Sequence, residues 1–316
     1  MKRNLVFIGL LNTLLLVCGQ EGFKSRVQFV TVEKATVLLT AKDTYINHLS
    51  QFDLNARMHK QNGTKEEQLK NIVAQIETWT PEEIQKINAA LEADDKYISA
   101  AALKINFPNE IFLVKSTMKD EGGSDGYTRG TYIVLKDDVM QLPEAKLQEI
   151  LLHELFHILS RTDSIFRQNM YAIIGFKLMN EVEYPATIKN YRITNPDAAR
   201  SDSYITLEKS GKPADYIMML YSAKEYTTGE FFDYINIGFV QLKGDAKKEP
   251  VLINGKPVIY SPDDLAEAFI KKIGFNTEYI IDPEEIMADN FVMAVTNKKG
   301  LPSPWITDQI REQLKQ

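Results

Sequence analysis

Cysteine is almost absent from this chain: Cys18 is the only one in 316 residues. A single thiol cannot pair within its own chain, so the folded body has no disulfide and its stability must come from packing. Basic residues are also the minority, with 37 Lys and Arg against 43 Asp and Glu, and the formal net charge is −6. A chain without a basic surplus lacks the electrostatic footprint of a nucleic-acid-binding protein, so we expect no nucleic-acid partner.

No apolar run is long enough to span a membrane, which takes about 20 residues. The longest run occupies residues 5–17 and directly follows Lys2 and Arg3. A basic start followed by a short apolar stretch is typical of a signal peptide. We therefore predict that residues 1–19 are an export signal and that the amino terminus is bacterial in type.

Two processing routes fit this amino terminus. Residues 15–18, Leu-Leu-Val-Cys, resemble a bacterial lipobox, which implies a lipid on Cys18 and a lipoprotein anchored to a membrane. Cleavage after Gly19 implies a free secreted protein instead. Both routes place the protein in the bacterial cell envelope or outside it, and a membrane would be contacted only through the lipid.

Histidine is scarce as well, with four in the chain, yet two of them, His153 and His157, lie four residues apart. The surrounding residues 143–161 carry apolar side chains at helical spacing and begin with Pro143, which suits a first helical position. On such a helix both imidazoles project from one face and can reach a single tetrahedral zinc. Glu154 lies beside them, where it can take a proton from a water on the metal.

This His-Glu-x-x-His run resembles the metal-binding helix of the zincin metallopeptidases. The resemblance implies a Zn²⁺ cofactor and a zinc metallopeptidase in which Glu154 is the catalytic base and His153 and His157 bind the metal. It also implies an α+β fold, a zincin-like catalytic domain in which a mixed sheet with an edge strand lies beside the active-site helix. The implied partner is a peptide or protein substrate.

A catalytic zinc site needs a third protein ligand and one position left open. Asp163 lies where metzincins place a third ligand, and Glu181 lies at a separation close to that of thermolysin-like enzymes. Our prediction is Glu285, because the run from Glu285 to Asp289 resembles the E-x-x-x-D glutamate helix of gluzincins. That resemblance implies that Glu285 binds zinc and that Asp289 accepts a hydrogen bond from His153, which fixes the tautomer of the imidazole.

A purely structural interpretation competes with this assignment. Asp282 and Glu285 also fit a capping box, in which Glu285 would only satisfy backbone N–H groups at the start of a helix. If the register is displaced by one residue, Glu284 is the ligand instead. The resemblance further implies a Tyr, His or Arg that stabilises an oxyanion, and the sequence does not single one out.

The patterning divides the chain after the export signal into four parts. We expect a helical region over residues 20–110, a catalytic core over 111–194, a β-rich insertion over 195–260, and the glutamate helix with further helices over 261–316. An Asn-Gly pair at Asn254 predicts a hairpin inside the β-rich insertion.

One strand of the expected catalytic core bears on function. Residues 130–135 form a strand just before the histidine helix and follow a glycine-rich loop at 121–126. In zincins the strand at this place is the edge strand, which binds an extended peptide by main-chain pairing. An ordinary interior strand fits the same residues equally well.

We therefore expect an exported zinc-dependent peptidase that hydrolyses peptide bonds with a water activated by Glu154. Two other functions fit the same motif. One is a surface binding lipoprotein with a structural or vestigial zinc site, and the other is a zinc hydrolase of a non-peptide amide. A structural zinc site would be closed by four protein ligands, and the sequence shows no obvious fourth.

Overall fold

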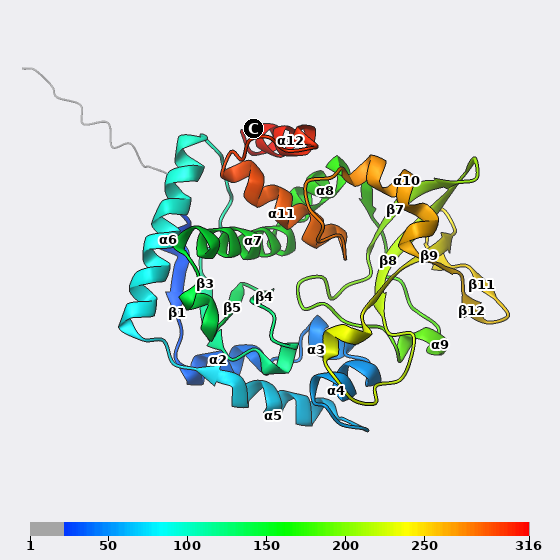
Figure 1. Cartoon of the computed structure of the whole chain (residues 1–316), viewed down its shortest axis with the longest axis horizontal. Helices are drawn as coiled ribbons and strands as arrows, with labels where there is room; N and C mark the ends of the chain where they lie inside the picture. Colours follow the sequence, from blue (N-terminus) through cyan, green and yellow to red (C-terminus); the bar gives the residue numbers. More distant parts are fainter. Residues whose placement is uncertain (1–21, 316) are drawn as a thin grey trace, which may run out of the picture.

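The computed structural model describes residues 22–315, so the predicted signal peptide and Cys18 lie outside the described residues. The elements form an α+β fold with two main sheets (Figure 1). The first sheet lies on one side of the molecule and the second sheet lies on the other. Within the described range, no helix is long and apolar enough to cross a membrane.

The region before residue 110 is mainly helical, as predicted. Its helices are α1 (Phe23–Arg26), α2 (Val32–Leu39), α3 (Thr44–His48), α4 (Gln51–Arg57), α5 (Lys65–Gln75) and α6 (Pro81–Ala100). At the start of α6 the Thr80 hydroxyl accepts a hydrogen bond from the Glu83 N–H, and the Glu83 carboxylate accepts one from the Thr80 N–H. The same reciprocal capping box begins α4 and α5, so polar side chains define where these helices start.

Five short strands form the first sheet: β1 (Val27–Phe29), β2 (Ile76–Glu77), β3 (Ile111–Ser116), β4 (Gly126–Arg129) and β5 (Tyr132–Lys136). β3 pairs in parallel with β1 and β5, and antiparallel with β2. Successive side chains of a strand point to opposite faces, and here both faces are buried. Leu113 packs into the core shared with α6 and α7, whereas Val114 packs with α2, α3 and α5.

The edge of the first sheet is β4. β5 lies between β3 and β4, so the strand expected at residues 130–135 is an interior strand and not the zincin-type edge strand. β4 and β5 pair antiparallel through a turn at Gly130, whose φ is 55°. The expected glycine-rich loop ends at Gly126, where β4 begins and covers the open edge of β5.

Helix α7 (Glu144–Thr162) runs through the middle of the molecule (Figure 1). Eleven of its 19 residues are buried, so it is covered on more than one face. Its neighbours include α6, β4, α8 (Ser164–Ile173) and α11 (Pro283–Val295), and α12 (Pro304–Lys315) packs behind α11. The rings of Phe156 and Phe291 lie 5.6 Å apart at the α7–α11 contact, which holds α11 against the histidine-bearing helix.

The second sheet contains most of the expected β-rich segment, and neighbouring strands in it are antiparallel. Its strands are β6 (Phe176–Leu178), β7 (Ser203–Lys209), β8 (Lys212–Tyr221), β9 (Asn236–Lys243), β10 (Glu249–Pro250) and β13 (Ile259–Tyr260). α10 (Pro262–Ile273) covers one face through Leu265 and Phe269. The predicted hairpin is confirmed: β11 (Leu252–Ile253) and β12 (Lys256–Pro257) join through Asn254, whose φ is 50°.

The remaining short elements lie in the connections. They are α9 (Ala186–Lys189) and three 3₁₀ helices, η1 (Lys119–Glu121), η2 (Asp137–Gln141) and η3 (Phe231–Tyr234). The connection between α9 and β7 passes along the edge of β4, where the Thr128 N–H donates a hydrogen bond to Asp197 Oδ1.

Candidate metal centre

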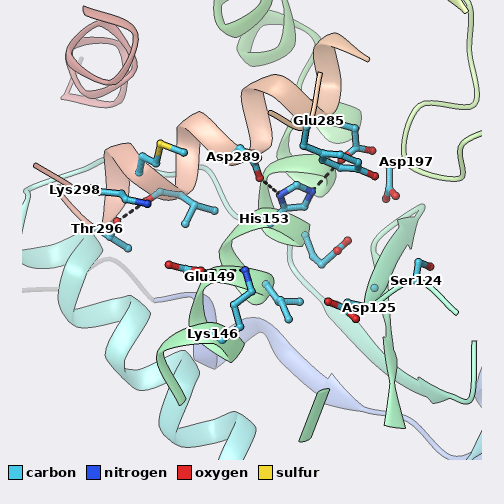
Figure 2. A pocket seen from close by; sticks show the side chains of 16 residues that line it. Ser124, Asp125, Lys146, Glu149, His153, Asp197, Glu285, Asp289, Thr296 and Lys298 are labelled. Carbon is cyan, nitrogen blue, oxygen red and sulfur yellow. Dashed lines mark hydrogen bonds and ion pairs between the residues drawn. The ribbon is translucent and has the colours of Figure 1, made fainter. Parts of the chain in front are cut away.

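Two helices bring three metal-binding side chains together. α7 presents His153 and His157 from one face, with ring centroids 4.8 Å apart, and α11 presents Glu285 opposite them. Glu285 Oε2 lies 3.0 Å from His153 Nε2 and 3.5 Å from His157 Nε2 (Figure 2 shows the contact with His153). A tetrahedral zinc with bonds of about 2.0–2.1 Å separates its ligand atoms by about 3.3 Å. Both distances from Glu285 Oε2 fit this spacing, and ligand atoms of all three residues lie within 4.8 Å of one another.

The hydrogen bonding of His157 supports the same fit. Its Nε2 atom is buried and has no hydrogen-bond partner within the described part of the chain. Leaving a buried polar atom without a partner costs about 1–3 kcal/mol, so native proteins seldom do so without another ligand. A metal ion held by His153, His157 and Glu285 would satisfy this atom.

Each histidine is oriented by a different carboxylate of α11. His153 Nδ1 lies 3.0 Å from Asp289 Oδ1, and the Thr277 hydroxyl donates to the other oxygen of Asp289. This contact leaves His153 Nε2 to face the metal position, as such outer partners do in metal sites. Burial lowers the pKa of His153, but its hydrogen bonds to Asp289 and Glu285 outweigh burial and raise the pKa to about 9.

Glu284 has a role that the sequence did not reveal. Its Oε1 lies 3.3 Å from His157 Nδ1, while Ser160 and Tyr171 donate hydrogen bonds to its Oε2 at 2.8 Å and 2.5 Å. Glu284 therefore faces the far side of His157, away from the point that Nε2 faces. One sequence signal could have indicated the pairing of Glu284 with His157. Two consecutive glutamates begin a helix, and two histidines lie one turn apart on another helix.

The capping-box interpretation of Glu285 is not what the structure shows. Asp282 alone caps α11, its carboxylate accepting a hydrogen bond from the Glu284 N–H at 2.9 Å. Glu285 is buried and uses its Oε1 to accept a hydrogen bond from Asn195 Nδ2 at 2.6 Å. Burial alone would raise the pKa of Glu285, but the neighbouring His157 and His153 hold it well below the usual value.

The two other candidate ligands lie elsewhere. Asp163 caps α8, where its carboxylate accepts hydrogen bonds from the N–H groups of Ile165 and Phe166. Glu181 pairs with His48 at 3.4 Å and with Arg200 at 3.6 Å. Each of these carboxylates already has a structural partner that draws it away from the two imidazoles.

Glu154 lies on the cavity side of α7, next to β4. A Cβ at Gly126 would lie 2.8 Å from Glu154 Oε1, so any larger residue here would force the Glu154 side chain to move. Glu154 Oε2 is buried without a hydrogen-bond partner among the described residues. Burial, with a smaller effect of the Asp197 charge, raises the pKa of Glu154 to about 8.

Asp197 and Asn195 belong to the site, although the sequence placed them at the start of the β-rich insertion. Ligand atoms of Asp197, Glu154 and His157 lie within 4.8 Å of one another. Asn195 connects the two parts of the site, because its Oδ1 accepts from the Asp197 N–H at 3.0 Å while its Nδ2 donates to Glu285. Their Asn-Pro-Asp run indicates a turn and nothing more, so no local pattern marked them as functional.

A cavity of about 470 Å³ lies over these residues. His153, Glu154, Asp197 and Glu285 line it together with Tyr279. In Figure 2, Asp197 lies beside Glu285 at one end of the cavity, and Lys146 and Lys298 lie toward the other. Two of the three residues that could hold a metal, His153 and Glu285, therefore border a space large enough for part of a substrate.

Comparison with known proteins gives no further guide. No protein-family model matches the chain, and neither a curated protein nor a solved structure is detectably similar to it.

Proposed function

We propose that the protein is an exported zinc-dependent peptidase of gluzincin type. The observation that carries the proposal is the convergence of three metal-ligating atoms, from His153, His157 and Glu285, beside the unpartnered Oε2 of Glu154. Three protein ligands leave one coordination position open, which is the arrangement of catalytic zinc and not of structural zinc. The cavity over the site gives a substrate access to that position.

When bound, zinc would act as a Lewis acid that polarises the substrate carbonyl and lowers the pKa of a water molecule to about 7. The protein supplies the proton transfers. Glu154 takes a proton from the attacking water and passes it to the leaving amine, which is general base and then general acid catalysis.

Tyr279 is our candidate for stabilising the oxyanion. It lines the cavity, and its ring centroid lies 6.4 Å from that of His153. The charge of Glu285 raises the pKa of Tyr279 well above its usual value, so the phenol stays protonated. A protonated phenol beside the reacting carbonyl can donate a hydrogen bond to the developing negative charge.

The experiment that tests the proposal compares the wild-type protein with Glu154→Gln, measuring bound metal and cleavage of a peptide library. We expect about one zinc per chain in both proteins, and a loss of turnover on the order of 10²–10⁴-fold in the variant, since Glu154 is a base and not a ligand. Glu144→Gln, on an exposed residue of the same helix outside the cavity lining, is the matched control. Cleavage by a zinc-loaded Glu154→Gln protein at the wild-type rate would refute the assignment.

A further inference from the structure

The outer edge of strand β4 borders the cavity beside Glu154. Two residues further on, at Thr128, the main-chain groups on this edge already have hydrogen-bond partners in the protein and cannot pair with a peptide. Thr128 directs its backbone away from β5, and both of its main-chain groups are already bonded. Its N–H donates to Asp197 Oδ1 at 2.6 Å, and its carbonyl accepts from Arg161 at 3.3 Å. By the two-residue period of a strand, Gly126 faces the same way, and it borders the cavity.

The closure is built into the fold. The Thr128 hydroxyl also donates to Asp197 Oδ1, at 2.9 Å. Arg161, one turn after His157 on α7, donates to the carbonyls of Asp197 and Gly130 at 3.1 Å and 3.2 Å. The loop that carries Asp197 is therefore attached both to β4 and to the active-site helix, and an extended peptide that pairs with β4 at Gly126 must end near Thr128.

Charge decides which end of a peptide fits there. Asp197 lines the metal cavity at the closed end, and Arg161 does not. Arg161 lines a neighbouring cavity that Asp197 also borders. Glu154 adds a second carboxyl group within 4.8 Å of the ligand atoms of Asp197 and His157. A carboxylate attracts an ammonium group and repels a substrate's terminal carboxylate, so the closed end suits an amino terminus.

We infer that Asp197 binds the free α-ammonium group of the substrate, so that the enzyme removes residues from the amino terminus of peptides. This inference rests on the proposed peptidase function. With its amino terminus at Thr128, a bound peptide runs antiparallel to β4 and places its first peptide bond beside Glu154. Hydrolysis breaks that C–N bond, transfers the water oxygen to the carbonyl carbon, and releases one amino acid and a peptide with a new amino terminus.

The test uses the zinc-loaded mature protein and two peptides of one sequence, one with a free amino terminus and one amino-acetylated. We expect release of single residues from the free peptide and a kcat/KM at least about 100-fold lower for the acetylated one. This comparison needs no variant, so it does not depend on the folding of a mutant.

Asp197→Asn tests the residue itself, because an asparagine oxygen still accepts both hydrogen bonds from Thr128 and only the charge is lost. We expect kcat/KM for the free peptide to fall by about 10–100-fold, mainly through KM, which is the loss expected for one charge-assisted hydrogen bond. The ratio of kcat/KM for the free peptide to that for the acetylated peptide should fall by the same factor. The zinc content should stay near one per chain. Asp245→Asn, on an exposed loop, should match the wild type.

Three results would overturn the inference in different ways. Equal cleavage of both peptides at internal bonds refutes amino-terminal selection but leaves the peptidase function intact. Loss of zinc or a gain of activity in Asp197→Asn would show that Asp197 is a fourth metal ligand. A zinc-loaded wild type that cleaves neither peptide nor any member of a library refutes the proposed function as well.

Discussion

At the scale of single residues, the candidate metal centre depends on how neighbouring carboxylates of α11 are used. Glu285 faces Nε2 of both histidines, whereas Glu284, one residue earlier, faces Nδ1 of His157. Adjacent helical positions point about 100° apart, so the two carboxylates reach different sides of one imidazole. Asp289, one turn after Glu285, reaches His153 Nδ1.

This division of roles predicts different outcomes for substitutions on one helix. Glu285→Ala removes a metal-ligating atom, so we expect zinc to be largely lost, as measured by metal analysis after dialysis. Asp289→Asn leaves the three ligating atoms in place, and losses of this kind are about 10–100-fold in metal affinity or activity. Glu181→Ala is the control and should keep one zinc per chain, because Glu181 pairs with His48 and Arg200. Zinc retained in Glu285→Ala would contradict the assignment.

At the scale of secondary-structure elements, the site lies where the edge strand β4 passes α7. Gly126 brings the strand against the carboxyl group of Glu154, and Thr128 holds the loop of Asp197. The strand is therefore both the wall of the cavity and the support of an acidic loop. Its position follows from the antiparallel pairing with β5, which orders it next to the histidine helix.

Gly126→Ala tests the contact between strand and base. The added Cβ would lie 2.8 Å from Glu154 Oε1 and 3.3 Å from the carbonyl oxygen of Val134, so Glu154 must move away. A displaced base loses its geometry, and we expect peptide hydrolysis to fall on the order of 10²-fold while zinc content stays unchanged. Lys119→Ala, on an exposed residue of η1 just before the loop, controls for changes in this part of the chain. Wild-type kinetics in Gly126→Ala would contradict the proposed position of Glu154.

At the scale of the whole molecule, folding buries carboxyl groups far from the metal centre. Asp94 on α6 is fully buried, and neither of its oxygens has a hydrogen-bond partner within residues 22–315. Burial, with a smaller effect of the Asp95 charge, raises the pKa of Asp94 to about 9. An aspartate in the unfolded chain has a pKa of about 3.9.

This difference predicts how stability depends on pH. Between pH about 4 and about 9 the folded protein keeps a proton on Asp94 that the unfolded chain releases, so the free energy of unfolding falls as pH rises. Below that window both states are protonated and the penalty disappears. Asp94→Asn should therefore raise the free energy of unfolding by roughly 1–4 kcal/mol at pH 8 and change it little at pH 4.

Urea denaturation of zinc-free protein at both pH values measures this effect without interference from metal binding. Asp138→Asn, on an exposed residue, serves as the control and should change the free energy of unfolding little at either pH. If Asp94→Asn destabilised the protein equally at pH 4 and pH 8, the predicted difference between the folded and unfolded pKa of Asp94 would be refuted.

The sequence by itself determined the features that have local causes. The turn at Asn254 appears as expected, because an Asn-Gly pair adopts the tight-turn conformation without help from distant residues. The helix through His153 and His157 also follows from local periodicity, and a helix places residues four apart on one face. Glu285 and Asp289 are also four residues apart, so the E-x-x-x-D run predicted that both carboxylates lie on the same face of a helix and belong to the metal site.

Only the tertiary structure decided which carboxylates surround the histidines. The packing of α11 on α7 places Glu284 behind His157, and the loop after α9 places Asp197 in front of it. The antiparallel pairing of β4 made it the edge strand in place of β5, because strand order depends on partners distant in the chain. Asp197 carries no local pattern at all: it enters the site because Thr128 and Arg161, from a strand and a helix, both bind its loop.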